Sequence, residues 1–224
     1  MEILFEDKYV IAVTKPAKQF VHPMQGEADS KDCLLFSVRD HIQTKLWPIN
    51  RLDRPVSGIV LFAKSPEIVT KFQDIWHLDS TQKKYTCLHR GLLEESGVFN
   101  SPLSKRSVNK EIHKDIKQEA LTLYNPLQVF KHEFCTLTEV EIKTGRYHQI
   151  RRHFRKAVMP IIGDRKHGKG VVNNHFLEIY GLDRIFLHAK ELIFIHPYTS
   201  HPIHISCTLP IELLSVLKKL KNEL

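Results

Sequence analysis

The stretch that decides the fold runs from residue 50 to residue 58 and reads Asn50-Arg51-Leu52-Asp53-Arg54-Pro55-Val56-Ser57-Gly58. It leads directly into Ile59-Val60-Leu61-Phe62-Ala63, an apolar run that is typical of a buried strand. One carboxylate, Asp53, therefore stands between two arginines in a turn at the start of that strand. An isolated Arg-Leu-Asp triplet is otherwise most often a surface ion pair that contributes little to stability. The function of Asp53 thus has to be judged from the rest of the chain.

The composition is that of a globular protein with an excess of positive charge. The 224 residues are 42% hydrophobic and 26% charged, so the chain can bury a core as one large domain or as two small lobes. The net charge at pH 7 is +8, which favours a polyanionic partner, most simply nucleic acid.

Cysteine spacing and the amino terminus indicate the cell compartment. The four cysteines are Cys33, Cys87, Cys135 and Cys207, and no two of them form a Cys-x-x-Cys pair. Such spacing is typical of reduced cysteines in a cytosolic protein rather than of a disulfide framework or a zinc site. Residues 1–8 carry acids where a signal peptide needs a basic start, and no segment approaches the ~20 apolar residues of a membrane span. We therefore expect a soluble, cytoplasmic protein.

Hydrophobic periodicity predicts strands interleaved with helices, several of them connected as hairpins. The strands are expected at residues 9–13, 59–63, 83–90, 135–143, 185–194 and 203–207. The helices are expected at residues 32–44, from 66 onward, at 146–156 and at 210–224, the last with Leu213, Leu214, Leu217 and Leu220 facing the core. This pattern indicates a mixed α+β fold. Residues 100–118 are basic and without clear periodicity, so they either face RNA, connect two lobes or form an ordinary solvated loop.

The basic helix in residues 146–158 contains an arginine that needs an anion. At about 100° per residue, its apolar stripe consists of Tyr147, Ile150, Phe154 and Val158. Arg151 lies at the edge of that stripe, whereas Arg152 and Arg155 lie progressively farther round. A guanidinium cannot lose its charge to escape burial, so we infer that Arg151 pairs with Asp53. From the projection alone, Arg151 could equally extend along its aliphatic stem to solvent.

Three longer segments and several shorter ones follow the motifs of one family. The segment 50–63, with Arg51-Leu52-Asp53 and Ser57-Gly58, resembles the catalytic motif of the RluA-type pseudouridine synthases, in which Asn50 replaces the usual histidine and Val56 the usual threonine. Thr144-Gly145-Arg146-Tyr147-His148-Gln149-Ile150-Arg151-Arg152-His153 resembles the family's Gly-Arg-x-His-Gln-Ile/Leu-Arg-x-His segment. Gln82-Lys83-Lys84-Tyr85 resembles its Lys-x-Tyr strand. Shorter similarities occur at Pro160-Ile161-Ile162-Gly163-Asp164, Leu187-His188-Ala189 and His196-Pro197.

The resemblance covers residues 4–207 and implies the pseudouridine synthase catalytic fold. That fold is α+β, with a mixed, largely antiparallel central sheet flanked by helices and an active-site cleft between two lobes. We expect residues 1–224 to form a single catalytic domain without an S4-like RNA-binding domain. The sequence Gly163-Asp164-Arg165-Lys166-His167-Gly168 is most similar to the tRNA-modifying TruC-like branch. This similarity implies modification of tRNA at uridine-65, with ribosomal RNA as the alternative substrate.

The resemblance also implies roles for individual residues in converting uridine to pseudouridine. Asp53 is the expected catalytic carboxylate, acting either as a nucleophile or as a base at the sugar. Arg151 would keep Asp53 ionised, because a nearby cation favours the charged form. Tyr85 would stack on the uracil and is a candidate carrier of the C5 proton, and Ile150 would line the pocket.

Contacts with RNA are expected from three arginines. Arg51, like the family residue that it matches, would fill the space left by a flipped nucleotide or hold its phosphate. Arg152 and Arg155 project from the solvent side of the basic helix and would supply salt-dependent, sequence-independent affinity. The isomerisation involves no redox step, so we expect no cofactor and no metal. Neither a membrane nor a protein partner is implied.

Two rival readings follow from the same residues. The 14 histidines allow a metallohydrolase, with His148 and His153 or with His196, His201 and His204 as ligands. His148 and His153 lie about 140° apart around a helix, and the second set lacks a carboxylate at ligand spacing. The other rival is a noncatalytic RNA-binding module that kept the fold. The presence of Asp53 argues against that module.

Overall fold

The computed structural model describes residues 1–23, 33–105 and 116–222. The chain divides into two compact units, unit 1 with Met1–Gln82 and His188–Thr208, and unit 2 with Lys83–Leu187 and Leu209–Leu224. Each unit has a hydrophobic core of its own. Strands, most of them antiparallel, are combined with helices, which confirms the predicted α+β class. Among the helices of the described ranges, none has the length and apolar character that crossing a membrane requires.

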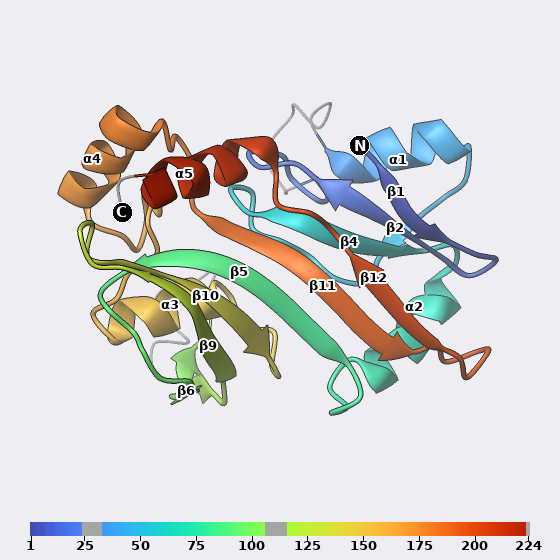
Figure 1. Cartoon of the computed structure of the whole chain (residues 1–224). Helices are drawn as coiled ribbons and strands as arrows, with labels where there is room; N and C mark the ends of the chain where they lie inside the picture. The colour runs from blue at the N-terminus through green and yellow to red at the C-terminus, as the bar shows by residue number, and fades with distance from the viewer. Residues whose placement is uncertain (24–32, 106–115, 223–224) are drawn as a thin grey trace. The chain divides into compact units, whose positions relative to one another are not determined.

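Unit 1 is built around the strand that follows the Asp53 turn. Its elements are β1 (Ile3–Glu6), β2 (Val10–Lys15), α1 (Leu34–Ile42), β3 (Trp47–Pro48), β4 (Ser57–Ala63), α2 (Pro66–Ile75), β11 (Leu187–Ile195) and β12 (Pro202–Ser206). Strand β4 pairs with β2 and β3 antiparallel and with β11 in parallel, while β1 extends the sheet beyond β2 and β12 pairs with β11 (Figure 1). All seven residues of β4 are buried, which explains its continuous apolar sequence.

Helix α2 closes the core of unit 1. Ser65 occupies its N-cap position with an extended backbone, and the helix begins at Pro66, the residue at which the sequence predicts its start. Ile68 and Phe72 are buried, and the ring of Phe72 meets Phe194 of β11 edge to face, with 5.4 Å between centroids. The helix therefore holds β4 and β11 from one side.

Unit 2 contains an antiparallel sheet in the order β5-β10-β9-β6. Its elements are β5 (Gln82–Arg90), β6 (Gly97–Asn100), β7 (Leu103–Ser104), β8 (Lys117–Gln118), β9 (Leu121–Phe130), β10 (Cys135–Ile142), α3 (Gln149–Lys156), α4 (Gly170–Tyr180) and α5 (Ile211–Asn222). Strands β7 and β8 form a separate two-stranded sheet at the base of the basic segment 100–118. Residues 106–115 of that segment lie outside the described residues, so contact with RNA, one of the three readings of the segment, stays a prediction.

The two faces of this sheet are covered by different helices. Helix α3 packs on the face that carries His89, whose ring lies 4.8 Å from that of Phe154. On the opposite face, Leu88 and Leu137 belong to a core that includes residues of α4 and α5. The predicted burial of one α5 residue is wrong. Leu214 is exposed, and Val216 is buried together with the other core residues of α5.

The basic helix is shorter than the sequence predicts. It begins at Gln149, because His148 adopts a left-handed conformation with φ of 51°. The Gln149 side chain accepts hydrogen bonds from the Arg146 amide (3.0 Å) and the Thr144 hydroxyl (2.7 Å), so it stabilises this entry turn. Two residues of the predicted apolar stripe therefore lie outside the helix: Tyr147 precedes it, and Val158 follows it with 67% exposure.

Candidate active site

The Asp53 turn combines two buried apolar side chains with two exposed arginines. Leu52 and Val56 are buried, Arg51 and Arg54 are exposed, and Asp53 is half-buried. The Asp53 carbonyl accepts a hydrogen bond from the Val56 amide at 3.0 Å, which closes the turn. The backbone of the turn is thus fixed by main-chain bonding and by two apolar anchors. The Asp53 carboxylate is not needed for that closure.

Asn50 binds the turn to strand β4. Its Nδ2 donates to the Ile59 carbonyl at 3.2 Å, and its Oδ1 accepts from the Leu61 amide at 2.8 Å. A carboxamide offers one donor and one acceptor side by side, which matches a carbonyl and an amide two residues apart on the strand. Asn50, which stands where the family usually has a histidine, therefore has a structural role here, because it binds the turn to β4.

Lys15 holds the other side of the turn from the end of β2. Its side chain is only 1% exposed, and its Nζ donates to the carbonyls of Pro16 (2.8 Å), Gln19 (2.8 Å) and Arg54 (3.2 Å). Hydrogen bonds from a charged donor are stronger than neutral ones. Lys15 thus fixes the residue that directly follows Asp53, a role that sequence analysis did not identify.

A buried Ser57–His188 pair joins the start of β4 to the start of β11. The Ser57 hydroxyl lies 2.8 Å from His188 Nδ1, and His188 Nε2 lies 3.2 Å from the Cys207 carbonyl. Because a carbonyl only accepts, Nε2 is the donor to Cys207, and in the neutral ring Nδ1 then accepts from Ser57. The next residue, Gly58, has φ of +124°, and a Cβ there would lie 2.2 Å from the Ala189 carbonyl oxygen. Only glycine permits this close pairing of the two strands.

The two arginines beside Asp53 have different surroundings. Arg51 is exposed, and its Nη1 lies 3.1 Å from His22 Nε2. Arg54 donates from Nε to the Lys18 carbonyl at 3.0 Å and covers the ring of Phe20 at 4.8 Å. Arg54 therefore stabilises the neighbouring loop, whereas contact of Arg51 with RNA stays a prediction.

Tyr85 lies in β5, opposite Val140 of β10, and is half-buried. Side chains alternate between the faces of a strand, so Tyr85 shares a face with Cys87 and His89. That is the face on which α3 packs. The expected stacking of Tyr85 on uracil stays a prediction.

His89 makes the stability of unit 2 sensitive to acid. Burial lowers the pKa of His89 to about 4, although its bond to the Arg90 carbonyl opposes that shift. In the unfolded chain the pKa is about 6.5, so the unfolded state binds the proton first and stability falls as the pH drops from 6.5 toward 4. We expect a loss of about 1.5 kcal/mol from His89 between pH 6.5 and 5. Urea unfolding at both pH values should show this loss, and His89→Gln, which cannot titrate, should lack it. An unchanged pH dependence in His89→Gln would contradict the assignment.

Arg151 is buried, as predicted, and an acidic partner holds it. Its side chain is 5% exposed, and Nε and Nη2 donate to Oδ2 and Oδ1 of Asp164, each at 2.8 Å. Burial raises the pKa of the Asp164 carboxyl, but Arg151 and the backbone amides of Lys166 and His167 outweigh burial, so the pKa lies below its usual value. The expected pairing of Arg151 with Asp53 joins residues of different units and stays a prediction.

Asp164 itself was not predicted as a site residue. Its Gly163-Asp164 motif was recognised, but it suggested no role. One signal could have identified it: a buried arginine needs an anion, and Asp164 is only 13 residues away, much closer in sequence than Asp53. Ile150, the apolar residue before Arg151, is buried. Its expected role in lining the pocket stays a prediction.

The other basic side chains of α3 mostly hold a neighbouring segment. Arg152 is half-buried and donates to the Ser104 carbonyl (3.0 Å) and hydroxyl (2.8 Å). Lys156 donates to the Pro102 carbonyl at 3.0 Å. Arg155 is exposed. Of the two arginines of α3 that are expected to contact RNA, Arg155 is thus the more accessible, and Arg152 also anchors strand β7.

Three histidines of the metal reading each lie beside a different side chain. His204 Nε2 lies 2.6 Å from Glu191, and His196 Nε2 lies 3.2 Å from Asp7. His148 Nδ1 lies 2.8 Å from His167 Nε2. Within the described ranges, no three His, Cys, Asp or Glu side chains form a group that could hold a metal ion.

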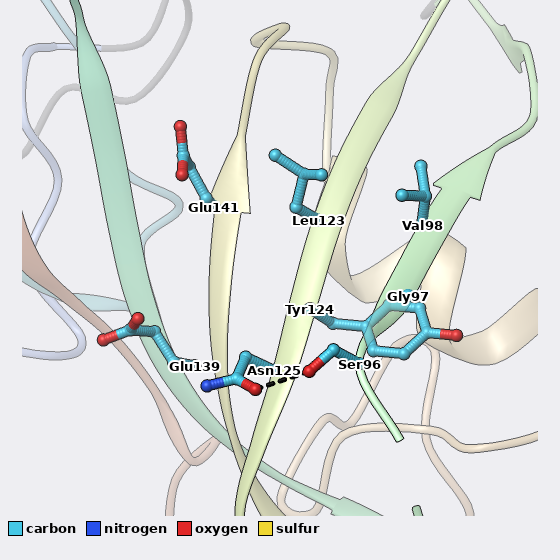
Figure 2. A pocket seen from close by; sticks show the side chains of 8 residues that line it. All are labelled: Ser96, Gly97, Val98, Leu123, Tyr124, Asn125, Glu139 and Glu141. Carbon is cyan, nitrogen blue, oxygen red and sulfur yellow. Dashed lines mark hydrogen bonds between the residues drawn. The ribbon is translucent and has the colours of Figure 1, made fainter.

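A surface hollow in unit 2 does not coincide with the expected site. It has a volume of about 450 Å³ and is lined by residues of β6, β9, β10 and the residue before β6 (Figure 2). Those residues are Ser96, Gly97, Val98, Leu123, Tyr124, Asn125, Glu139 and Glu141. Figure 2 shows Ser96 bonded to Asn125, with Glu139 and Glu141 along one side. Two carboxylates are poorly suited to an RNA backbone, and no residue predicted for the reaction lines the hollow.

Known proteins with the same sequence pattern and fold identify the chemistry. The family described as RNA pseudouridylate synthase matches residues 9–156, which include the Asp53 turn, Tyr85 and Arg151. The tRNA pseudouridine synthase C of Vibrio cholerae is 37% identical over 217 residues, covering 91% of this chain and 88% of the relative. That of Pasteurella multocida is 35% identical over 218 residues, covering 92% and 90%.

Solved structures agree at the level of the fold. Human RNA Pseudouridylate Synthase Domain Containing 4 superposes with a TM-score of 0.75 at 23% identity, covering 98% of this chain and 93% of that chain. Human RNA Pseudouridylate Synthase Domain Containing 1 gives 0.71 at 16% identity. The α+β fold and the matched motifs define the class of protein, an enzyme that isomerises uridine in RNA to pseudouridine. The chain belongs to the RNA pseudouridylate synthase family.

Proposed function

We propose that this enzyme converts a specific uridine of a tRNA to pseudouridine, with Asp53 as its catalytic carboxylate. One observation carries the choice of substrate: the relatives that match over nine-tenths of the chain are named tRNA pseudouridine synthase C. The net charge of +8 suits a partner rich in phosphates. Position 65 of the tRNA, implied by the TruC-like resemblance, is part of this proposal.

The site has to support three steps of the reaction. The bond between N1 and C1′ breaks, the detached uracil turns, and C5 bonds to C1′ before losing its proton. In its ionised form, Asp53 would act at the ribose or at the uracil, either as a nucleophile or as a proton acceptor. A catalytic group works only when it is held in position, and the bonds made by Asn50 and Lys15 hold the backbone on both sides of Asp53.

The remaining residues would prepare the uridine and the carboxylate. Arg151 would favour the ionised form of Asp53, and Tyr85 would stack on the uracil and carry the C5 proton. The target nucleotide has to leave its helix to reach Asp53, and Arg51 would occupy the vacated place or bind the displaced phosphate. Arg155, together with Arg152, would add electrostatic affinity.

The location of the enzyme is also a proposal. All four cysteines are buried and none is part of a disulfide, a state that suits the reducing conditions of the cytoplasm. Access to tRNA requires the same compartment.

The test is conversion of an unmodified tRNA transcript by the purified protein in excess chelator. We expect pseudouridine at one position, without an added cofactor. Apparent affinity should fall steeply with salt, because each neutralised phosphate contributes a slope of roughly −0.7 to −0.9 in log K against log salt. Position mapping of the product identifies the uridine.

Three other outcomes are informative. If only ribosomal RNA fragments react, the tRNA assignment is wrong and the enzyme class is retained. If both RNAs react only after a metal is supplied, the metal reading has to be reopened. Binding without conversion of any RNA would favour a noncatalytic module.

A further inference from the structure

The loop from Gly163 to Gly168 is held against the start of α3 by three pairs of side chains. Asp164 binds Arg151. His167 Nε2 lies 2.8 Å from His148 Nδ1, and Lys166 Nζ donates to the Tyr147 hydroxyl at 3.2 Å. The loop therefore follows the entry turn and first turn of the helix.

The Asp164–Arg151 pair fixes orientation as well as position. Two parallel hydrogen bonds of 2.8 Å join the planar guanidinium to the planar carboxylate. Because Asp164 takes the edge formed by Nε and Nη2, a second anion would have to approach from the side of Nη1. Asp164 thus decides which edge of Arg151 faces a further partner.

The backbone of Asp164 is fixed by contacts that do not involve Arg151. Asn173 of α4 accepts from the Gly163 amide at 2.8 Å and donates to the Asp164 carbonyl at 3.1 Å. The Gly168 amide donates to the same carbonyl at 2.8 Å. Gly163 has φ of +79°, and a Cβ there would lie 2.0 Å from the Arg184 carbonyl oxygen. The carboxylate is therefore placed by the loop, and the longer arginine side chain adapts to it.

A buried ion pair of this kind has little value as a simple stabiliser. The cost of removing two charges from water can exceed their attraction, and apolar pairs of similar size are often as stable. With exposures of 4% and 1% for Arg151 and Asp164, the pair is better explained by a need for a charged group at a defined orientation.

We propose that Asp164 is a positioning residue for the isomerisation, acting by orienting the guanidinium of Arg151 toward the reacting groups. The inference rests on the proposed function, because it takes Arg151 as the active-site arginine. Asp164 touches neither the uridine nor Asp53 in this scheme. Its effect on the rate passes entirely through Arg151.

The experiment compares Asp164→Asn with Asn173→Ala in the full chain. Asp164→Asn keeps the size of the side chain and an acceptor for the loop amides but loses the charge and one acceptor for Arg151. Asn173→Ala removes two bonds that hold the same loop and leaves the guanidinium contact in place. The readouts are melting temperature, affinity for a tRNA transcript, and the single-turnover rate at saturating transcript.

We expect Asp164→Asn to lower the rate at saturation by about 10²-fold, the size of effect that misplacing a catalytic group by an ångström can have, with affinity within about three-fold. Asn173→Ala should lower the melting temperature at least as much and keep the rate within about three-fold of the unmodified protein. In an Arg151→Ala background, Asp164→Asn should cause no further loss of rate, because the guanidinium that Asp164 orients is absent. If Asp164→Asn does not fold, Asp164→Glu, which keeps the charge but shifts the guanidinium, should show the same loss of rate.

Several results would overturn the inference. Equal rates for Asp164→Asn and Asn173→Ala, or a further loss of rate in the Arg151→Ala background, would make Asp164 a purely structural residue. Weaker affinity for the transcript together with an unchanged rate at saturation would do the same. If the unmodified protein converts no RNA, the proposed function fails first and this inference fails with it, whereas an active unmodified protein tests Asp164 alone.

Discussion

Replacing Asp53 with asparagine is expected to abolish pseudouridine formation and to leave RNA affinity within a few-fold of that of the unmodified protein. The carboxamide has the shape of the carboxylate but can neither attack the sugar nor accept a proton from it. Removing a nucleophile of this kind lowers rates by roughly 10⁴-fold to 10⁶-fold. The measurement is single-turnover conversion of a tRNA transcript, with binding measured on the same preparation.

The structure explains why folding should survive this change. The turn closes through the Asp53 carbonyl, which the substitution retains, and is held by Asn50 and Lys15. Asp40→Asn is a matched control, because Asp40 is exposed and pairs with Arg39 on the surface of α1 in the same unit. It should behave like the unmodified protein. Turnover by Asp53→Asn above about a hundredth of the normal rate would remove Asp53 from the chemistry.

The fold was predictable wherever burial leaves a periodic pattern. Strand β4 is buried on every residue, and its uninterrupted apolar run identified it together with the turn before it. Helix α4 was missed, because its sequence contains two valines and two asparagines and few good helix formers. Burial of Phe176 and Tyr180 stabilises this helix, and such tertiary packing is not visible in local sequence.

Strand β9 was missed for a related reason. It contains Pro126 in its middle, which argues against a strand by local rules. The proline sits opposite Thr138 at a register shift between β9 and β10. Bulges accept proline because they already interrupt the hydrogen-bond ladder. Whether a proline is accepted in β9 therefore depends on its register with the partner strand β10.

For the candidate site, the sequence predicted that Arg151 is buried but not which carboxylate it binds, and the roles of the other site residues stay predictions. Helical projection placed Arg151 at the edge of the buried stripe, where burial requires an anion. Arg151 is buried and its carboxylate partner is Asp164, whereas the expected pairing with Asp53 stays a prediction. The projection could not find Asp164, because a loop conformation with positive φ at Gly163 brings that carboxylate to the helix. For the same reason, the bonds of Arg152 to Ser104 were not foreseen. Side-chain contacts that depend on the conformation of a loop are the hardest to predict from sequence.

Arg151→Ala is expected to lose both stability and activity, in contrast to Arg155→Ala on the same helix. Removing the guanidinium leaves the Asp164 carboxylate buried without its cation, and breaking a buried pair costs roughly 3–5 kcal/mol. If Arg151 also serves Asp53, turnover should fall by about 10²-fold or more, the effect of removing one electrostatic contact in an active site. Urea unfolding and single-turnover kinetics measure the two losses separately.

Arg155 provides the comparison, because it lies one turn farther along α3 and is exposed. Arg155→Ala should change the free energy of unfolding by no more than about 0.5 kcal/mol. It should weaken tRNA binding and reduce the salt slope by about one phosphate contact. Arg152→Ala should weaken RNA binding too and also lose stability, because two bonds to Ser104 disappear. Equal, mild effects at positions 151 and 155 would contradict the buried assignment.

The stability loss of Arg151→Ala has a cause that can be reversed. If most of it comes from the uncompensated charge of Asp164, then adding Asp164→Asn should restore part of the stability, since a neutral amide costs less to bury than a lone carboxylate. Activity should not return, because the arginine is still missing. Recovery of stability without recovery of turnover would separate the two roles of Arg151, one in the core of unit 2 and one in the reaction. If neither recovers, lost packing of the arginine stem is the main cause of the destabilisation.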